Sequence, residues 1–79
     1  MHTKIVTSVR YIWFDQLHNR FTFRPCPGRE YYVGFITAIE NGRVLWRKPV
    51  DPDQPSLTAK DALYNAEAAA AWLRKTDAV

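Results

Sequence analysis

The fold is decided by residues 49–76, which read PVDPDQPS followed by LTAKDALYNAEAAAAWLRKT. Three prolines in residues 49–56 favour an extended, polyproline-like segment that is long enough to cross a sheet. Residues 57–76 place alanine and leucine at helical spacing, which predicts an amphipathic helix. The sequence therefore predicts an antiparallel sheet at residues 3–48, a proline-rich crossing segment at 49–56 and an amphipathic helix at 57–76, within a single domain spanning residues 1–79.

The part of the chain before these prolines has the signals of strands and turns. Asn41-Gly42 is the strongest short signal for a β-hairpin, because a type I′ turn needs a positive φ at both residues. We expect strands at residues 4–14, 20–24, 30–40 and 43–48, and the first of these could be one strand or two. The expected fold class is α+β: a three- to four-stranded antiparallel meander (β-β-β(-β)-α) with one C-terminal helix packed on one face.

The hairpin turn also predicts which face of the sheet is buried. A two-residue turn sets Glu40 opposite Arg43 and Thr37 opposite Trp46. One face of the hairpin then holds the apolar side chains of Val33, Phe35, Ile39, Val44 and Trp46. Because the other face carries three charges, we expect the apolar face to be the core.

The helix presents a narrow stripe of mostly small side chains to the sheet. On a helical wheel this stripe consists of Ala59, Ala62, Leu63, Ala66, Ala69, Ala70 and Leu73. Thr58 is expected to cap the helix, with Asp61 at the third helical position. Tyr64 and Trp72 fall outside the stripe. Trp72 could contact another protein or fold over the helix end to cover the sheet margin, and both readings stay open.

Length and composition limit the function classes. The 79 residues provide one small core, and the single cysteine, Cys26, excludes an internal disulfide. No run approaches the ~20 apolar residues of a membrane span, so we expect a cytoplasmic protein without a membrane partner. His18 and Cys26 lack the spacing of a metal site or of a nucleophile with its base. We therefore expect no enzyme activity, no cofactor and no metal.

Charge is distributed unevenly along the chain. Residues 1–48 carry eight basic and three acidic side chains, a net charge of +5, whereas residues 49–79 carry three basic and five acidic side chains, a net charge of −2. Six of the eight basic side chains are arginine, which suits planar, bidentate contact with phosphate or carboxylate. The sheet half is therefore the basic half of the protein.

These features support two classes of function. The first is a small protein-interaction module (an adaptor, an inhibitor or a self-associating domain such as a homodimer), because the 4–14 strand outreaches its neighbours and exposed edge strands pair with other chains. The alternative is a nucleic-acid-binding module that uses the basic outer face of the sheet, first of all around Arg43 and Arg47. The same arginines would also suit an acidic protein surface or simple solvation. The binding residues that we expect are Arg10, Tyr32, Arg43, Arg47, Arg20, Arg24 and Trp72.

The order of strands followed by a helix resembles the C-terminal part of double-stranded-RNA-binding domains. Residues 58–73, with their Ala-Ala-Ala-Ala-Trp-Leu ending, are similar to the last helix of that fold. This chain differs in having no first helix. It also has Lys60 alone beside Asp61, where that family places a lysine cluster on phosphates. The resemblance therefore covers topology, and we do not transfer the RNA-binding activity to this chain.

Overall fold

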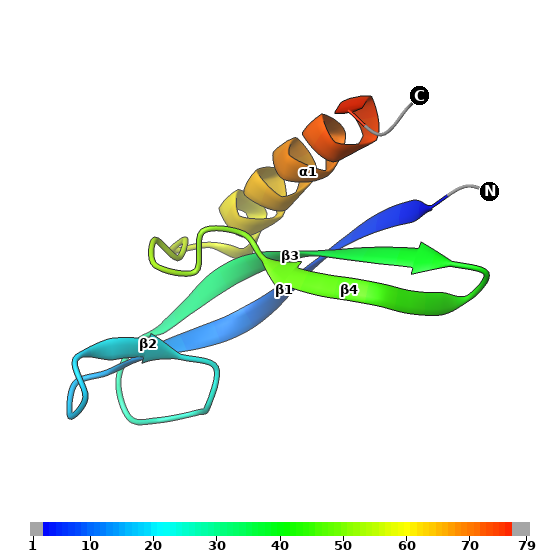
Figure 1. Cartoon of the computed structure of the whole chain (residues 1–79). Helices are drawn as coiled ribbons and strands as arrows, with labels where there is room; N and C mark the ends of the chain where they lie inside the picture. The colour runs from blue at the N-terminus through cyan, green and yellow to red at the C-terminus, as the bar shows by residue number, and fades with distance from the viewer. Residues whose placement is uncertain (1–2, 77–79) are drawn as a thin grey trace.

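The computed structural model of the protein describes residues 3–76. Its elements are β1 (Lys4–Asp15), β2 (Arg20–Thr22), β3 (Glu30–Glu40), β4 (Arg43–Pro49) and α1 (Ala59–Thr76). The strands form one antiparallel sheet in the order β2-β1-β3-β4, and α1 packs on one face of it, across β1 and β3 (Figure 1). The predicted α+β class is confirmed, and residues 4–15 form one strand rather than two.

The helix lies on the sheet face that carries Gly34, Ile36 and Ala38, not on the predicted apolar face. Ile5, Ile36, Ala38 and Ala70 form the core cluster on this side. The prediction of the core face was wrong because it considered hydrophobicity and not the space that a helix needs. Gly34 and Ala38 have almost no side chain, so the backbone of α1 approaches β3 closely.

A β-bulge in the hairpin accounts for the position of Trp46. The Asn41-Gly42 turn has positive φ at both residues, 53° and 76°, and Glu40 lies opposite Arg43 as predicted. The register then shifts, so that Ala38 rather than Thr37 lies opposite Trp46, and Leu45 is the extra residue. Trp46 therefore joins the side chains beneath α1, while Val44 stays on the opposite face and is 62% exposed.

A second, smaller cluster lies on the sheet face opposite α1. Ile12, Val33 and Phe35 are buried there, and three partly buried rings pack against them, Phe21, Phe23 and Tyr31. The burial predicted for Val33 and Phe35 is thus observed, but aromatic rings provide it instead of the helix. Phe21 comes from β2 and Phe23 from the loop that follows, so this short hairpin covers one end of the face.

The crossing segment and the helix start agree with their sequence signals. Residues 50–58 connect β4 to α1, and Ser56 exchanges two backbone hydrogen bonds with Tyr32, with N···O distances of 2.8 and 2.9 Å. Thr58 Oγ1 accepts a hydrogen bond from the N–H of Asp61 at 3.1 Å, so Thr58 is the predicted N-cap and the helix proper begins at Ala59. The buried part of the helix is narrower than the predicted stripe, because Ala59 and Leu63 are exposed.

Candidate functional site

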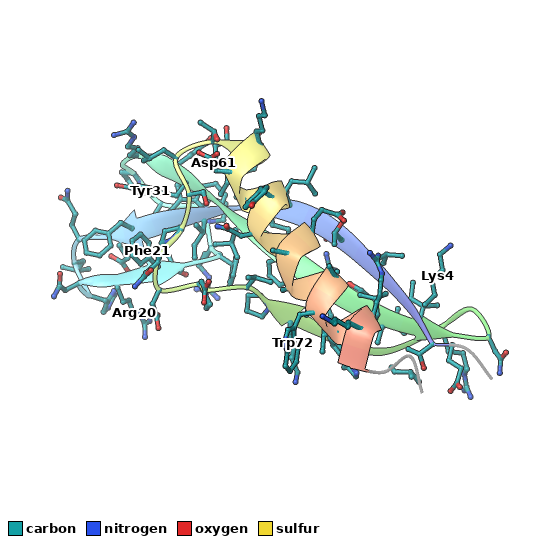
Figure 2. All side chains as sticks on the ribbon, turned by 90° about the horizontal axis from the view of Figure 1, so that it is seen from above. Lys4, Arg20, Phe21, Tyr31, Asp61 and Trp72 are labelled. Atoms are coloured by element: carbon teal, nitrogen blue, oxygen red, sulfur yellow. The ribbon has the colours of Figure 1, made fainter. Side chains whose placement is uncertain are left out.

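The sheet leaves most of β1 without a neighbour on its outer side. β3 pairs with β1 from Lys4 to Trp13 on the inner side. On the outer side β2 pairs only with residues Trp13 to Asp15. Within residues 3–76 no other strand pairs with β1 there, so residues 4–12 form an open edge that Figure 2 shows along one long side of the sheet.

The backbone groups that face this open side follow from the ladder. The C=O of Gly34 accepts a hydrogen bond from Val50 N at 2.8 Å on the β4 side, so Gly34 directs its backbone away from β1. Its partner Val9 must then direct its N–H and C=O away from β3. Because this direction alternates along an antiparallel strand, the same holds for Ile5, Thr7 and Tyr11. We call the outward backbone of Ile5, Thr7, Val9 and Tyr11 the β1 edge.

One flank of α1 lies above the β1 edge. Thr7 Oγ1 donates a hydrogen bond to Glu67 Oε1, and Arg74 Nη2 donates one to the C=O of Ile5 at 2.6 Å. The Arg74 bond agrees with an outward direction of the Ile5 backbone. Leu63 precedes Glu67 by four residues, so it lies on the same flank, and it is 41% exposed. The helix thus leaves an apolar side chain beside the open edge.

The opposite edge of the sheet is protected against pairing. β4 contains the bulge at Leu45 and ends at Pro49, which has no N–H to donate. It also carries the basic side chains of Arg43, Arg47 and Lys48. Bulges, prolines and charges are the features by which edge strands avoid unwanted pairing. The β4 edge of this sheet is therefore protected against pairing, whereas the β1 edge is open.

The sheet face opposite α1 brings two of the predicted binding residues together. The guanidinium carbons of Arg10 and Arg47 lie 5.6 and 5.2 Å from the centroid of the Phe35 ring, and Arg10 is also 5.6 Å from the centroid of Phe23. These are cation–π distances. We call this side of the sheet the arginine face; its strand residues include Lys4, Arg10, Phe35 and Arg47.

The remaining predicted binding residues lie elsewhere. Tyr32 is on the helix side, where its ring centroid is 5.3 Å from that of Tyr11. Arg43 also belongs to the helix side, because it pairs with Glu40 at the hairpin end. Arg20 pairs with Asp15 at the far end of the sheet, Arg24 follows β2, and Trp72 is 65% exposed on the last turns of α1 (Figure 2). The predicted surface around Arg43 and Arg47 is therefore divided between two faces.

The turn after β1 holds an ionisable pair. Asp15 Oδ2 accepts a hydrogen bond from His18 Nδ1 at 2.6 Å, and Asp15 Oδ1 accepts from the N–H groups of Leu17 and His18. The hydrogen bond from the His18 side chain lowers the pKa of Asp15, and the backbone N–H groups lower it further. Cys26 has a different partner, since its Sγ donates to the C=O of Phe14 at 3.8 Å. Within residues 3–76 no group of three or more His, Cys, Asp or Glu side chains is placed to hold a metal ion.

Two features of these surfaces were missed from the sequence. Phe35 was predicted as core, but its ring is also the platform on which Arg10 and Arg47 lie. The outward residues of the β1 edge were not identified, although the length of residues 4–14 against 20–24 is a signal that one strand outreaches its neighbour. Neither the register nor the direction of the backbone groups is visible before the strands are paired.

Comparisons with models of protein families, with curated proteins and with solved structures found no match. The likeness to double-stranded-RNA-binding domains therefore rests on element order. In the part of the chain that the structure describes, no helix has the length and apolar character needed to cross a membrane.

Proposed function

We propose that this protein is a protein-interaction module that associates with a second copy of itself through the β1 edge. The observation that carries the proposal is the row of backbone groups at Ile5, Thr7, Val9 and Tyr11, which no strand of the described chain pairs. An open row of N–H and C=O groups is a template for another strand. Adding a strand there satisfies these groups and extends the sheet.

A second copy is favoured because one edge of the sheet is open and the other is protected. A strand that pairs antiparallel with its own copy makes an isologous interface, in which each chain contributes the same surface. The pairing uses up both open edges, while the β4 edges at the ends carry the bulge at Leu45 and Pro49. The assembly therefore closes at two chains instead of growing into a filament.

The charges on β1 argue against one of the registers that this pairing could adopt. With Ser8 on the two-fold axis, Thr7 pairs with Val9 of the second copy and Arg10 lies opposite Val6. With Thr7 on the axis, Lys4 would lie opposite Arg10, and like charges directly opposite each other are destabilising. The Ser8-centred register is therefore preferred to the Thr7-centred one. In the Ser8-centred register, every outward N–H of the β1 edge meets a C=O of the second copy.

The helix flank is compatible with this arrangement. A two-fold axis perpendicular to the sheet keeps both α1 helices on one side, and Leu63 of each chain then faces the junction between the two copies. The Arg74 bond to the C=O of Ile5 can remain, because a carbonyl oxygen accepts two hydrogen bonds. The new strand pair can therefore form while the contacts of Glu67 and Arg74 with β1 stay intact.

Sedimentation of the full chain over a range of concentrations tests the proposal. We expect the mass to rise from 9.2 kDa towards twice that value. Val9→Pro removes one outward N–H without touching the β1–β3 ladder, so it should shift dimerisation to at least tenfold higher concentration. Val9→Ala is the matched control, since it loses the same side chain and keeps the N–H, and it should dimerise nearly as well as wild type. A mass of 9.2 kDa for wild type at millimolar concentration would exclude self-association and leave a strand of another protein as the occupant.

A further inference from the structure

The arginine face carries charge of one sign only among its strand residues. Lys4 and Arg10 lie on this side of β1, and Arg47 lies on this side of β4 because it pairs with Thr37. The acids of the strands are Asp15, Glu30 and Glu40. By the alternation of the pleat all three belong to the helix side. The net positive charge of the strands therefore lies on this face, because the three acids share the helix side with Arg20, Arg43 and Lys48.

The two arginines on this face are held in place without an acidic partner. Their guanidinium groups lie over the same ring, Phe35, which is only 6% exposed. Within residues 3–76 no carboxylate lies within ion-pair distance of either guanidinium group. A contact with the Phe35 ring takes up none of the guanidinium N–H donors in a hydrogen bond, so these donors remain available to an acceptor. Two neighbouring, pre-positioned guanidinium groups form a site for an anionic ligand.

Partly exposed aromatic rings continue this face towards β2. Phe14 and Phe21 lie 5.1 Å apart between ring centroids, and Phe21 is 5.6 Å from Tyr31. Arg29 adds a further guanidinium 5.9 Å from the Tyr31 ring. None of these three rings is fully buried. The face therefore presents basic groups at its centre and aromatic rings at one end.

We propose that the arginine face binds single-stranded nucleic acid, with Arg10 and Arg47 contacting phosphates and the ring cluster of Phe14, Phe21 and Tyr31 contacting bases. Basic groups that follow the backbone, together with rings on which bases stack, are the usual requirements for single-strand binding. An acidic peptide would use the arginines but not the rings. This function goes beyond self-association, and it uses a sheet face rather than the β1 edge.

The test is fluorescence anisotropy of a labelled single-stranded DNA oligonucleotide titrated with the full chain at low salt. We expect the affinity to fall linearly with salt on logarithmic axes. Arg10→Gln with Arg47→Gln should weaken binding at least tenfold. The matched control is Lys60→Gln with Lys75→Gln, which removes the same charge from exposed positions of α1 and should leave the affinity within about twofold. Equal losses in both double variants would overturn the proposal, because they would mean attraction by net charge alone.

Further variants and competitors distinguish nucleic-acid binding from other causes of the same result. Arg10→Lys with Arg47→Lys keeps the charge and tests the guanidinium, and should weaken binding at least threefold. This pair decides the question if the glutamine variant fails to fold. A polyglutamate peptide that displaces the oligonucleotide at equal charge concentration would indicate an acidic protein partner. Duplex DNA that competes as well as unlabelled single-stranded DNA would show that the rings do not contact bases. Either outcome contradicts the proposal. Val9→Pro should bind the oligonucleotide at the low protein concentrations where wild type is monomeric, so this inference and self-association can fail separately.

Discussion

Gly34 of β3 and Ala66 of α1 approach so closely that a β-carbon at Gly34 would lie 2.7 Å from Cβ of Ala66. The same β-carbon would overlap with the carbonyl oxygen of Ala62. This contact sets how near the helix lies to the sheet, and it determines which sheet face the helix can cover. On the opposite face of the same strand, Val33 and Phe35 would hold a helix farther away.

Gly34→Ala should therefore destabilise the protein, although alanine ordinarily suits a strand better than glycine. The added methyl group meets backbone of α1 that cannot rotate away, so the helix must shift, and we expect a loss of about 1–3 kcal/mol in the free energy of unfolding. Urea denaturation followed by circular dichroism measures the loss. Ala68→Ser, at an exposed position of α1, should change the value by less than about 0.5 kcal/mol. A Gly34→Ala protein as stable as wild type would show that the helix does not pack as described.

Trp46 and Val44 test the register of the hairpin. Trp46 packs against the core cluster beneath α1. Trp46→Ala should therefore lower the free energy of unfolding by about 2–4 kcal/mol, which is less than for a fully buried tryptophan because this ring is only partly buried. Val44 is 62% exposed on the opposite face, so Val44→Ala should cost less than about 0.5 kcal/mol. Without the bulge both residues would lie on one face, and similar losses for the two variants would argue against it.

The hairpin also shows how far the sequence could predict this fold. Asn41-Gly42 predicted the turn and the Glu40–Arg43 pair correctly, because a tight turn has few geometries. The bulge at Leu45 has no local signal, since Val44, Leu45 and Trp46 all suit a strand. The helix start was predictable from Thr58, whose hydroxyl serves the N-cap in any context. The sheet face that the helix covers was not predictable, because it depends on how closely the helix can approach the sheet.

The candidate functional surfaces were also predictable only in part. Arg10 and Arg47 were identified from residue type alone, and pairing through β3 brings them to one ring. Arg43 was grouped with Arg47 because strict alternation over residues 43–47 would put them on one side, and the bulge separates them. The β1 edge depends on the direction of backbone groups, which the sequence does not encode at any single residue.

The Asp15–His18 pair gives a pH prediction. The carboxyl of Asp15 should titrate with a midpoint below its usual pKa in a carboxyl-detected NMR titration, and His18→Ala should move that midpoint upwards, because the His18 hydrogen bond is the largest cause of the shift. A depressed pKa in the folded state stabilises the fold above the unfolded pKa, and this stabilisation is lost as the pH falls through the folded pKa. Leu17→Ala keeps its backbone N–H bond to Asp15 and should leave the midpoint unchanged.

The central claim is that the outward backbone of β1 pairs with a second copy of the chain, and amide hydrogen exchange at two protein concentrations tests it most directly. The inward amides of Val6, Ser8 and Arg10 bond within the β1–β3 ladder and should be protected at every concentration. At low micromolar concentration the amides of Ile5, Thr7, Val9 and Tyr11 should exchange fast. At millimolar concentration we predict that these four become protected as well, removing the alternation along β1. If the alternation persists unchanged at millimolar concentration, the β1 edge is not the site of self-association.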